Sequence, residues 1–247
     1  MRPTSPVRLD GLLVERGLSA SLEEARTLIA SGRVLVDRVP VTSLDAQARP
    51  DREISIAQGG VSWVSRGALK LLSVIEAFGV QPMGCTCVDL GSSTGGFTQV
   101  LLEKGAQRVY AVDVGKGLLD WNLRQDPRVV VMEGVNARHL AALPDAIDLL
   151  VGDLSFISLE LILPSVARLL RPGGQAVVLV KPQFEVRRSA VGVGGRVRSD
   201  SDRLGAISKI VEEATEQGFE VLNGMDSGVS GAKARNVEHF LHLRRRH

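Results

Sequence analysis

The amino-acid sequence predicts an α/β protein in which a mostly parallel seven-stranded sheet, covered by helices on both faces, follows a small α+β domain. Two observations lead to this prediction. From about residue 85 onward, short segments rich in Val, Leu and Ile alternate with segments of helical pattern, which is typical of parallel strands joined by helices. The first sixty residues have a different pattern and too little apolar material for a large core of their own.

The larger domain is predicted to span residues 66–247. Its first five strands are expected at 85–90, 108–114, 128–133, 147–153 and 175–181. Its helices are expected at 65–78, from the glycines near residue 95 to 104, at 159–170 with a stop at 171–174, and at 201–217. Two further strands, 219–226 and 238–244, are joined by a loop without a helix, which predicts an antiparallel hairpin at the edge of the sheet.

The small domain is predicted to span residues 1–60, with a linker at 61–65. A first helix runs from Arg8 to Arg16, because its leucines recur at helical spacing. Ser21 opens a second helix, and Glu24, three residues on, completes a capping box. Short strands are expected at 34–36 and 53–57, before a flexible joint at 58–60.

Composition excludes several classes of protein. The N-terminus has no apolar signal segment, and no window approaches the length of a membrane-spanning helix, so a soluble cytoplasmic protein is expected. The net charge is only +2, but Arg greatly outnumbers Lys, and Arg holds phosphate bidentately. Cys85 and Cys87 lack further cysteines to complete a zinc site and are interpreted as buried core thiols. No metal ion is expected, and the protein is expected to be a monomer.

A glycine-rich turn follows the first strand of the larger domain, in the string VDLGSSTGGF at 88–97. Glycines let a backbone approach a ligand closely, and the helix after them offers unpaired N–H groups. The spacing is not that of a dinucleotide motif, so the turn favours S-adenosylmethionine over a pyrophosphate. Asp113 ends the second strand and is expected to bind ribose hydroxyls, although NAD would need the same acid. Asn136 is placed beside the adenine, or else is a plain turn residue.

The candidate cofactor residues therefore lie at the carboxyl ends of the predicted strands, where ligands of such sheets bind. They are Asp89, Gly91, Ser92, Ser93, Thr94, Gly95, Gly96, Phe97, Asp113, Asn136 and Asp153.

Arginines are spread through the small domain, and a solvated surface balanced by nearby acids is one interpretation. The string RLDGLLVERGLSASLEEARTLIASGRVLV, at 8–36, however resembles the S4 RNA-binding domain. In that family a basic residue usually follows the Ser that opens the second helix, and here Leu22 stands there. The resemblance implies that the small domain binds RNA. The candidate RNA-binding residues are Arg8, Arg16, Arg26, Arg33, Arg66, Arg187 and Arg188.

Four strings of the larger domain carry a second resemblance: SRGALKL with Lys70, GDLSFIS with Asp153, VKPQFE with Lys181, and NVEHF with Glu238. Together with the S4-like segment they resemble the TlyA, or haemolysin A, family of ribosomal RNA methyltransferases. The resemblance implies a Rossmann-like class I methyltransferase fold, similar to the FtsJ ribose 2′-O-methyltransferases. It also implies a Lys-Asp-Lys-Glu catalytic set, S-adenosylmethionine as cofactor and the 2′-hydroxyl of a cytidine in 23S or 16S ribosomal RNA as substrate.

Such a set suits the chemistry. A ribose hydroxyl is a weak nucleophile and must lose its proton as it attacks the methyl group. Lys181 follows a buried strand, where desolvation and a neighbouring cation favour a neutral amine that accepts a proton. Lys70 is that second cation and stabilises developing negative charge, while Asp153 and Glu238 orient the two lysines.

Three features leave alternatives open. Arg235 stands where the family has a glycine before its Asn, so the loop before Glu238 differs from the family pattern. The Arg- and Gly-rich segment 186–198 is either a second RNA contact or a mobile solvated loop. The sequence ends shortly after the last strand, without the extra helix typical of family members that modify both subunits, which favours the large-subunit RNA.

Competing functions are a non-catalytic S4-type ribosome-assembly factor, a small-molecule methyltransferase and a haemolysin. The intact catalytic set opposes the first, and the S4-like domain has no purpose in the second. The haemolysin would need a membrane-spanning segment or a strongly amphipathic basic helix, and the sequence contains neither.

Overall fold

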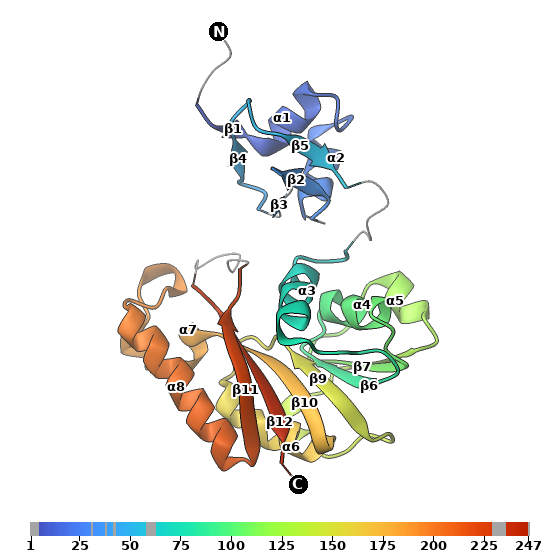
Figure 1. Cartoon of the computed structure of the whole chain (residues 1–247), viewed down its shortest axis with the longest axis vertical. Coiled ribbons are helices and arrows are strands. Elements are labelled where there is room, and N and C mark those ends of the chain that lie inside the picture. The colour runs from blue at the N-terminus through green and yellow to red at the C-terminus, as the bar shows by residue number, and fades with distance from the viewer. Residues whose placement is uncertain are drawn as a thin grey trace. The chain divides into compact units, whose positions relative to one another are not determined.

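The computed structural model describes residues 5–30, 32–37, 39–41, 43–57, 63–228 and 236–246. It divides into two compact units, residues 1–69 and 70–247, which are described separately. Figure 1 shows both units and labels their helices and strands. The predicted joint at 58–60 lies outside the described residues.

The N-terminal unit packs two helices against short strands. Its elements are β1 (Val7–Arg8), α1 (Leu9–Glu15), α2 (Leu22–Ala30), β2 (Val34–Val36), β3 (Val39–Val41), β4 (Gln47–Ala48) and β5 (Ile54–Ile56). β2 lies between β3 and β5, and β1 pairs with β4. The predicted capping box is present, because the Ser21 hydroxyl accepts the Glu24 N–H at 3.1 Å and the Glu24 carboxylate accepts the Ala20 N–H at 2.6 Å. Both predicted helices are therefore confirmed.

The larger unit contains one seven-stranded sheet. Its strands are β6 (Thr86–Leu90), β7 (Arg108–Asp113), β8 (Val129–Glu133), β9 (Ile147–Gly152), β10 (Leu170–Val180), β11 (Phe219–Asp226) and β12 (His239–Arg245). The order is β11-β12-β10-β9-β6-β7-β8, with β6 to β10 parallel and β12 antiparallel to both of its neighbours. The predicted α/β class and the antiparallel hairpin at the sheet edge are confirmed.

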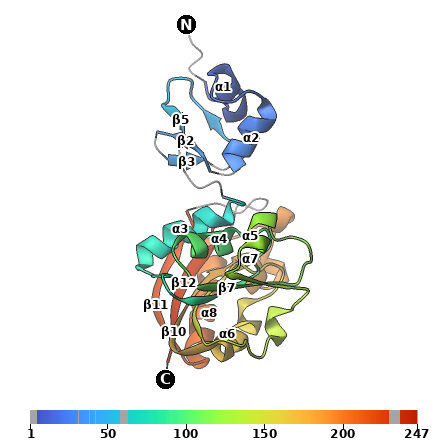
Figure 2. The ribbon, with the colours of Figure 1, turned by 90° about the vertical axis from the view of Figure 1, so that its right-hand side faces the viewer.

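Helices cover both faces of this sheet. They are α3 (Gly67–Phe78), α4 (Gly96–Glu103), α5 (Trp121–Gln125), α6 (Leu163–Leu169), α7 (Pro182–Glu185) and α8 (Asp200–Glu216), with 3₁₀ turns η1 (Ala137–His139), η2 (Leu159–Leu161), η3 (Arg188–Ala190) and η4 (Val193–Gly195). On one face α6 and α8 bury side chains against alternate strand residues such as Val88, Leu150 and Val178. On the other, Phe78 of α3 stacks on His242, and Phe97 of α4 stacks on Phe240. Figure 2 shows the unit from its side.

Two sequence-based expectations about the sheet are wrong in detail. β10 begins at Leu170, five residues before its predicted start, because Leu170 already pairs with Ile147 of β9. The register then shifts before Gln175, and Gly173, with φ +76°, lets the intervening residues bulge out. Cys87 is buried in β6, but Cys85 precedes that strand and is only half-buried, so it is not a core thiol.

The strand order indicates where on the sheet a ligand binds. The chain moves from β6 to β7 in one direction and returns on the other side of β6 with β9, so the order reverses beside β6. In open α/β sheets, ligands bind outside the carboxyl ends of the strands at that reversal.

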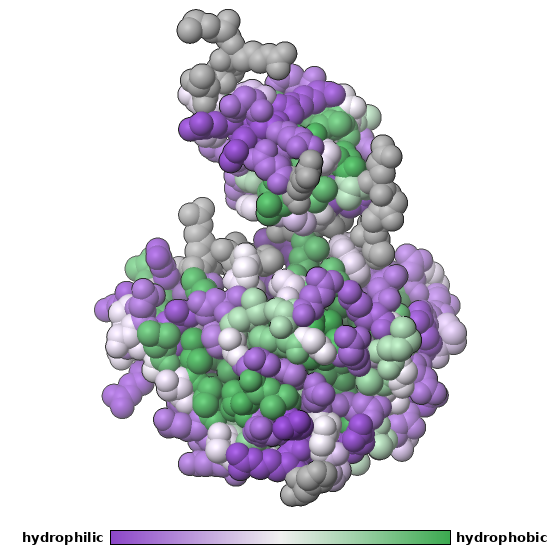
Figure 3. All heavy atoms as spheres, viewed as in Figure 1, coloured by the Kyte–Doolittle hydropathy of each residue, from purple (hydrophilic) through white to green (hydrophobic). Residues whose placement is uncertain are grey.

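The described surface in Figure 3 mixes hydrophilic and hydrophobic residues. Among the described residues, none of the helices combines the length and hydropathy that a membrane-spanning segment requires.

His242 makes stability of the larger unit sensitive to pH. It lies in β12, stacks on Phe78 with ring centroids 5.4 Å apart, and its Nε2 lies 2.8 Å from Oε1 of Gln175. Burial, aided by the nearby Arg244, lowers the pKa of His242 below its ordinary value. The folded protein therefore holds the imidazole neutral, and this stabilisation is present above the unfolded pKa and lost as pH falls through the folded one.

We accordingly expect the free energy of unfolding to fall as pH drops below about 6.5, and to fall less in His242→Gln. Urea unfolding between about pH 5 and pH 8 measures both slopes. His139→Gln, at an exposed position, is the matched control and should behave as the parent. Equal pH slopes for the parent and His242→Gln would contradict the role given to His242.

Candidate active site

Four charged side chains form a continuous chain of ion pairs at the carboxyl edge of the sheet. Nζ of Lys70 lies 2.6 Å from Oε2 of Glu238 and 3.7 Å from Oδ2 of Asp153. Nζ of Lys181 lies 2.6 Å from Oδ1 of Asp153 and donates to Oγ of Ser155 at 2.7 Å. Lys70, Lys181 and Glu238 are buried. The structure thus brings together all four residues that the sequence strings singled out.

The strand order explains why these residues meet. Asp153 follows β9 and Lys181 follows β10, and these strands are parallel neighbours. Glu238 directly precedes β12, which runs antiparallel beside β10, so the start of β12 lies at the carboxyl end of β10. Lys70 comes from α3, which packs on β12 through Phe78. Four separate elements are therefore needed to assemble the cluster.

The two lysines have different surroundings. Lys70 has two carboxylate partners, so its ammonium charge is fully matched. Lys181 forms an ion pair with one carboxylate and donates a hydrogen bond to one hydroxyl. An ammonium has three N–H groups, so Lys181 can bind a further oxygen. Ser155 is a partner that sequence reasoning missed, and its only signal was its place in the string that carries Asp153.

The glycine-rich turn lies directly against this cluster. The N–H of Asp153 donates to the carbonyl of Leu90 at 3.1 Å, and Gly91 follows Leu90 with φ +82°. A Cβ on Gly91 would lie 2.9 Å from the backbone oxygen of Asp153, closer than side chains tolerate. Glycine at position 91 therefore allows the turn between β6 and α4 to touch the segment that carries Asp153.

Gly95 has a backbone conformation and close neighbours that favour glycine. It has φ +96° and precedes α4. A Cβ there would lie 2.3 Å from Cδ1 of Leu123 and 2.8 Å from Cδ1 of Leu119, so it would strike the protein's own leucines. Phe97, another candidate, is buried and stacks on Phe240. Both residues shape the turn through core packing.

Asp89 is a buried acid with one satisfied oxygen. Its Oδ2 accepts the N–H of Thr98 at 2.9 Å and the Thr98 hydroxyl at 2.7 Å. Its Oδ1 is buried and has no hydrogen-bond partner among the described residues. Burial raises the pKa of Asp89 to about 7, against the opposing hydrogen bonds from Thr98. An orphaned carboxylate oxygen beside a glycine-rich turn fits a cationic ligand group such as an ammonium.

The side chains of two other candidate cofactor residues, Asp113 and Asn136, accept hydrogen bonds from backbone N–H groups. Asp113, at the end of β7, accepts the N–H of Ser93 at 2.9 Å and the N–H of Gly115 at 2.7 Å, so it fastens the glycine-rich turn to the next loop. Each oxygen keeps a lone pair for a further donor. Asn136 is exposed and accepts the N–H of Arg138 at 3.0 Å, which caps η1.

Comparison with known proteins agrees with this geometry. Residues 63–245 match the model of the FtsJ-like methyltransferase family, and residues 7–54 match the S4 domain. The chain belongs to the TlyA, or haemolysin A, family of FtsJ-like methyltransferases. It is 42% identical to the 16S/23S rRNA (cytidine-2′-O)-methyltransferase TlyA of Mycobacterium tuberculosis, over 96% of this chain and 89% of that protein.

Two further relatives cover nearly the whole chain. Hemolysin A of Brachyspira hyodysenteriae is 36% identical over 96% of this chain and 99% of its own. A solved structure, a putative hemolysin from Streptococcus thermophilus, has 35% identity and a TM-score of 0.74, covering 99% of this chain and 90% of that one. The resemblance drawn from the sequence is therefore confirmed, as is the class I methyltransferase fold with an S4 domain before it.

The candidate RNA-binding arginines of the S4 domain have structural partners. Asp10 is buried, and its Oδ2 lies 2.8 Å from Nη2 of Arg8 and 3.0 Å from Nε of Arg26. These arginines hold the pKa of Asp10 well below its usual range. Arg16 donates to the backbone oxygens of Pro50 and Arg52. Arg8 and Arg26 nevertheless keep about half of their side-chain surface exposed, at 49% and 53%.

The remaining candidates lie outside that cluster. Arg33 is half-buried in the S4 domain, and Arg66 is half-buried one residue before α3. Arg187 and Arg188 are exposed after α7. Arg235, where the chain departs from the family pattern, lies outside the described residues. Within those that are described, no group of His, Cys, Asp or Glu side chains is arranged to hold a metal ion.

The raised pKa of Asp89 can be tested through the pH dependence of stability. A carboxyl whose folded pKa is raised stabilises the fold when protonated, and that stability is lost as pH rises from its unfolded value towards about 7. Asp89→Asn keeps an oxygen for Thr98 and cannot ionise. We therefore expect the difference in free energy of unfolding to shift in favour of Asp89→Asn as pH rises from about 4 to about 7, and to level off above that. Urea unfolding of the ligand-free protein measures it, and a pH-independent difference refutes the raised pKa.

Proposed function

We propose that this chain transfers a methyl group from S-adenosylmethionine to the 2′-hydroxyl of a cytidine ribose in ribosomal RNA. The observation that carries the proposal is the ion-pair chain from Glu238 through Lys70 and Asp153 to Lys181, directly beside a glycine-rich turn. The 42% identical relative, a 16S/23S rRNA (cytidine-2′-O)-methyltransferase, supports the choice of substrate.

The turn after β6 and the acids beside it are proposed to hold the cofactor. The orphaned Oδ1 of Asp89 accepts a hydrogen bond from its ammonium group, and Asp113 accepts bonds from its ribose hydroxyls. The backbone around Gly91, Ser93 and Thr94 binds its amino-acid end. Asn136 is placed beside the adenine. When bound, S-adenosylmethionine supplies an electrophilic methyl group on a sulfonium.

Lys181 is proposed to act on the ribose hydroxyl. Its third N–H position is available for the 2′-oxygen, so the side chain either holds this hydroxyl as an ammonium or accepts its proton as an amine. Asp153 fixes the position of Nζ and stabilises the ammonium that proton transfer produces. Lys70 and Glu238 balance the charge of Asp153 and keep the cluster in place. The protein thereby contributes alignment and electrostatic stabilisation.

Recognition of the RNA is proposed to rest on arginines of both units. The candidates are Arg8, Arg16, Arg26 and Arg33 of the S4 domain, together with Arg66, Arg187 and Arg188. Their planar guanidinium groups match phosphate oxygens. Mapping ribose methylation on both ribosomal RNAs, in cells that have and lack the gene, identifies the modified nucleotide and the subunit that carries it.

Replacing Lys181 should abolish chemistry and spare cofactor binding. We expect Lys181→Ala to reduce the single-turnover methylation rate by roughly 10²–10⁴-fold, the usual contribution of a positioned acid or base. Calorimetry should find cofactor affinity within about a few-fold of the parent, since Lys181 acts on the nucleophile. Lys104→Ala is the control. Lys104 lies directly after the C-terminal end of α4, where it pairs with Glu76 at the surface.

Lys181→Arg separates the two possible roles. A guanidinium stays charged and cannot accept a proton, so an enzyme that needs a general base stays inactive. A near-native single-turnover rate in Lys181→Arg would leave only the role of a cation that holds the hydroxyl. An active Lys181→Ala enzyme would overturn the catalytic assignment.

Removing residues 1–65 tests the division of labour between the units. The segment 66–247 contains every proposed cofactor and catalytic residue, whereas four of the proposed arginines lie before it. We expect this segment to bind S-adenosylmethionine as the full chain does and to methylate ribosomal RNA poorly, because phosphate contacts dominate RNA affinity. Methylation at the full-length rate by the truncated protein is the result that would contradict an RNA-binding S4 domain.

A further inference from the structure

An unneutralised group of arginines follows the proposed catalytic lysine. Arg187, Arg188, Arg196 and Arg198 are exposed, and none of them makes an ion pair with any described residue. Arg203, farther along, pairs with Asp226 at 2.9 Å. The positive charge of this segment is therefore available to an outside anion without breaking an ion pair, whereas Arg8 and Arg26 in the S4 domain are paired with Asp10.

Residues 190–198 form a hydrogen-bonded hairpin. Val191 and Val197 are antiparallel partners, the N–H of Gly192 donates to the carbonyl of Arg196 at 2.7 Å, and the N–H of Arg198 donates to that of Ala190 at 3.1 Å. The tip turns through glycines 194 and 195, with φ values of +75° and +80°. Arg196 and Arg198 thus stand on the returning arm of a hydrogen-bonded hairpin.

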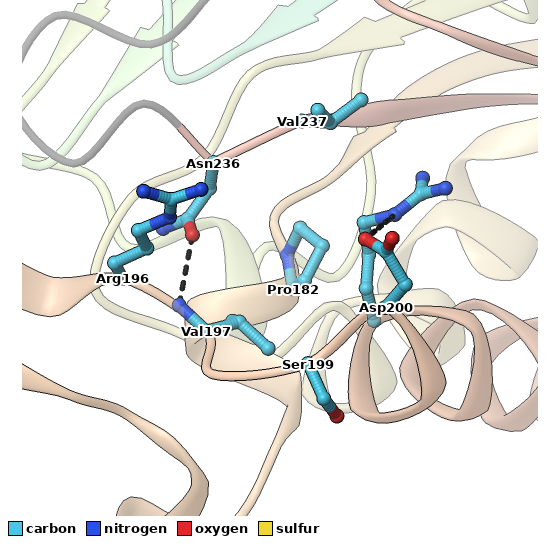
Figure 4. A pocket seen from close by; sticks show the side chains of 8 residues that line it. Pro182, Arg196, Val197, Ser199, Asp200, Asn236 and Val237 are labelled. Atoms are coloured by element: carbon cyan, nitrogen blue, oxygen red, sulfur yellow. Dashed lines mark hydrogen bonds and ion pairs between the residues drawn. The ribbon is translucent and has the colours of Figure 1, made fainter.

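Asn236 ties this hairpin to the candidate active site. Its Oδ1 accepts the N–H of Val197 at 2.9 Å, and its Nδ2 donates to the carbonyl of Gly195 at 2.8 Å. Asn236 is buried and stands two residues before Glu238, which pairs with Lys70. Figure 4 shows the bond from Asn236 to Val197. The position of the arginines is therefore coupled to that of the proposed catalytic cluster.

A small pocket lies between the hairpin and residues that adjoin that cluster. Its volume is about 60 Å³, and its lining includes Arg196, Asp200, Arg203 and Asn236 together with Pro182 and Val237 (Figure 4). Pro182 directly follows Lys181, and Val237 directly precedes Glu238. An adjoining open groove extends along the hairpin past Arg198. The one acid at this groove, Asp200, has a side chain that is 96% exposed and lies 3.9 Å from Arg203.

We infer that this groove is a phosphate subsite for the RNA strand flanking the modified ribose, with Arg196 and Arg198 as its phosphate ligands and Asn236 as the residue that positions them. The inference rests on the proposed function. A 2′-hydroxyl and the 3′-phosphate of its nucleotide are attached to neighbouring carbons, so a hydroxyl bound at Lys181 brings backbone phosphates close to the pocket walls at Pro182 and Val237. Two guanidinium groups without protein partners are suited to bind them.

The double substitution Arg196→Ala/Arg198→Ala in the full chain tests the subsite on ribosomal subunits from cells lacking the gene. We expect KM for the subunits to rise roughly tenfold, with kcat and cofactor affinity little changed. The slope of log affinity against log salt should become shallower by about 1.4, the loss of two phosphate contacts to a single strand. Arg171→Ala/Arg244→Ala is the control. It removes the same charge at the opposite end of the strands and should keep the parent KM and salt slope.

Asn236→Ala tests positioning. It should raise KM for the subunits in the parent, and it should have no further effect in the Arg196→Ala/Arg198→Ala background, because it acts through those arginines. A purely structural role for Asn236 would add its effect in both backgrounds, and additive effects overturn the positioning role.

Binding to the subunits requires no methyl transfer, so the two proposals fail separately. Salt slopes and KM values of Arg196→Ala/Arg198→Ala equal to those of the parent, or matched by the Arg171→Ala/Arg244→Ala control, overturn the phosphate subsite. A parent chain that binds the subunits with the expected salt slope and transfers no methyl group refutes the proposed function and leaves the subsite standing.

Discussion

The site depends on the interactions that the carboxylate of Asp153 makes. It lies 2.6 Å from Lys181 and 3.7 Å from Lys70, two buried lysines that would otherwise repel each other. A buried charge is costly unless it is paired. The backbone of the same residue donates to Leu90 and touches the turn at Gly91. One residue therefore fixes the distance between the proposed catalytic cations and the proposed cofactor turn.

This arrangement explains why the second acid is present. Asp153 carries one negative charge and faces two cations, so on its own it would leave a buried positive charge unmatched. Glu238, at 2.6 Å from Lys70, supplies the balancing charge. Lys70 then has two carboxylate partners and Lys181 has one, so Lys181 is the lysine with the less completely matched charge. The strand order makes this possible, since the antiparallel β12 begins where the parallel β10 ends.

Much of this could be predicted from the sequence, and the failures have physical reasons. The alternation of apolar strands and helices predicted the sheet, and short distinctive strings predicted the four charged residues. The roles of Ser155 and Asn236 could not be predicted, because they depend on side-chain hydrogen bonds between segments far apart in the chain. The reason for Gly95 was likewise hidden, since the leucines it avoids come from another loop and helix. The two-residue strands β1 and β4 are too short to have a periodicity.

The partners of the arginines matter more than their number. The sequence showed arginines in both units and gave no means of ranking them. In the S4 domain, the buried Asp10 holds Arg8 and Arg26 and takes up part of their charge. In the larger unit, Arg196 and Arg198 have no acidic partner among the described residues and stand on a hairpin fastened by Asn236. An anion that binds an unpaired guanidinium gains its full electrostatic attraction. An anion that binds a paired guanidinium must weaken an existing ion pair. The hairpin should therefore contribute strongly to RNA affinity close to the site of methylation, while the S4 arginines, pre-oriented by Asp10, contribute more to shape recognition.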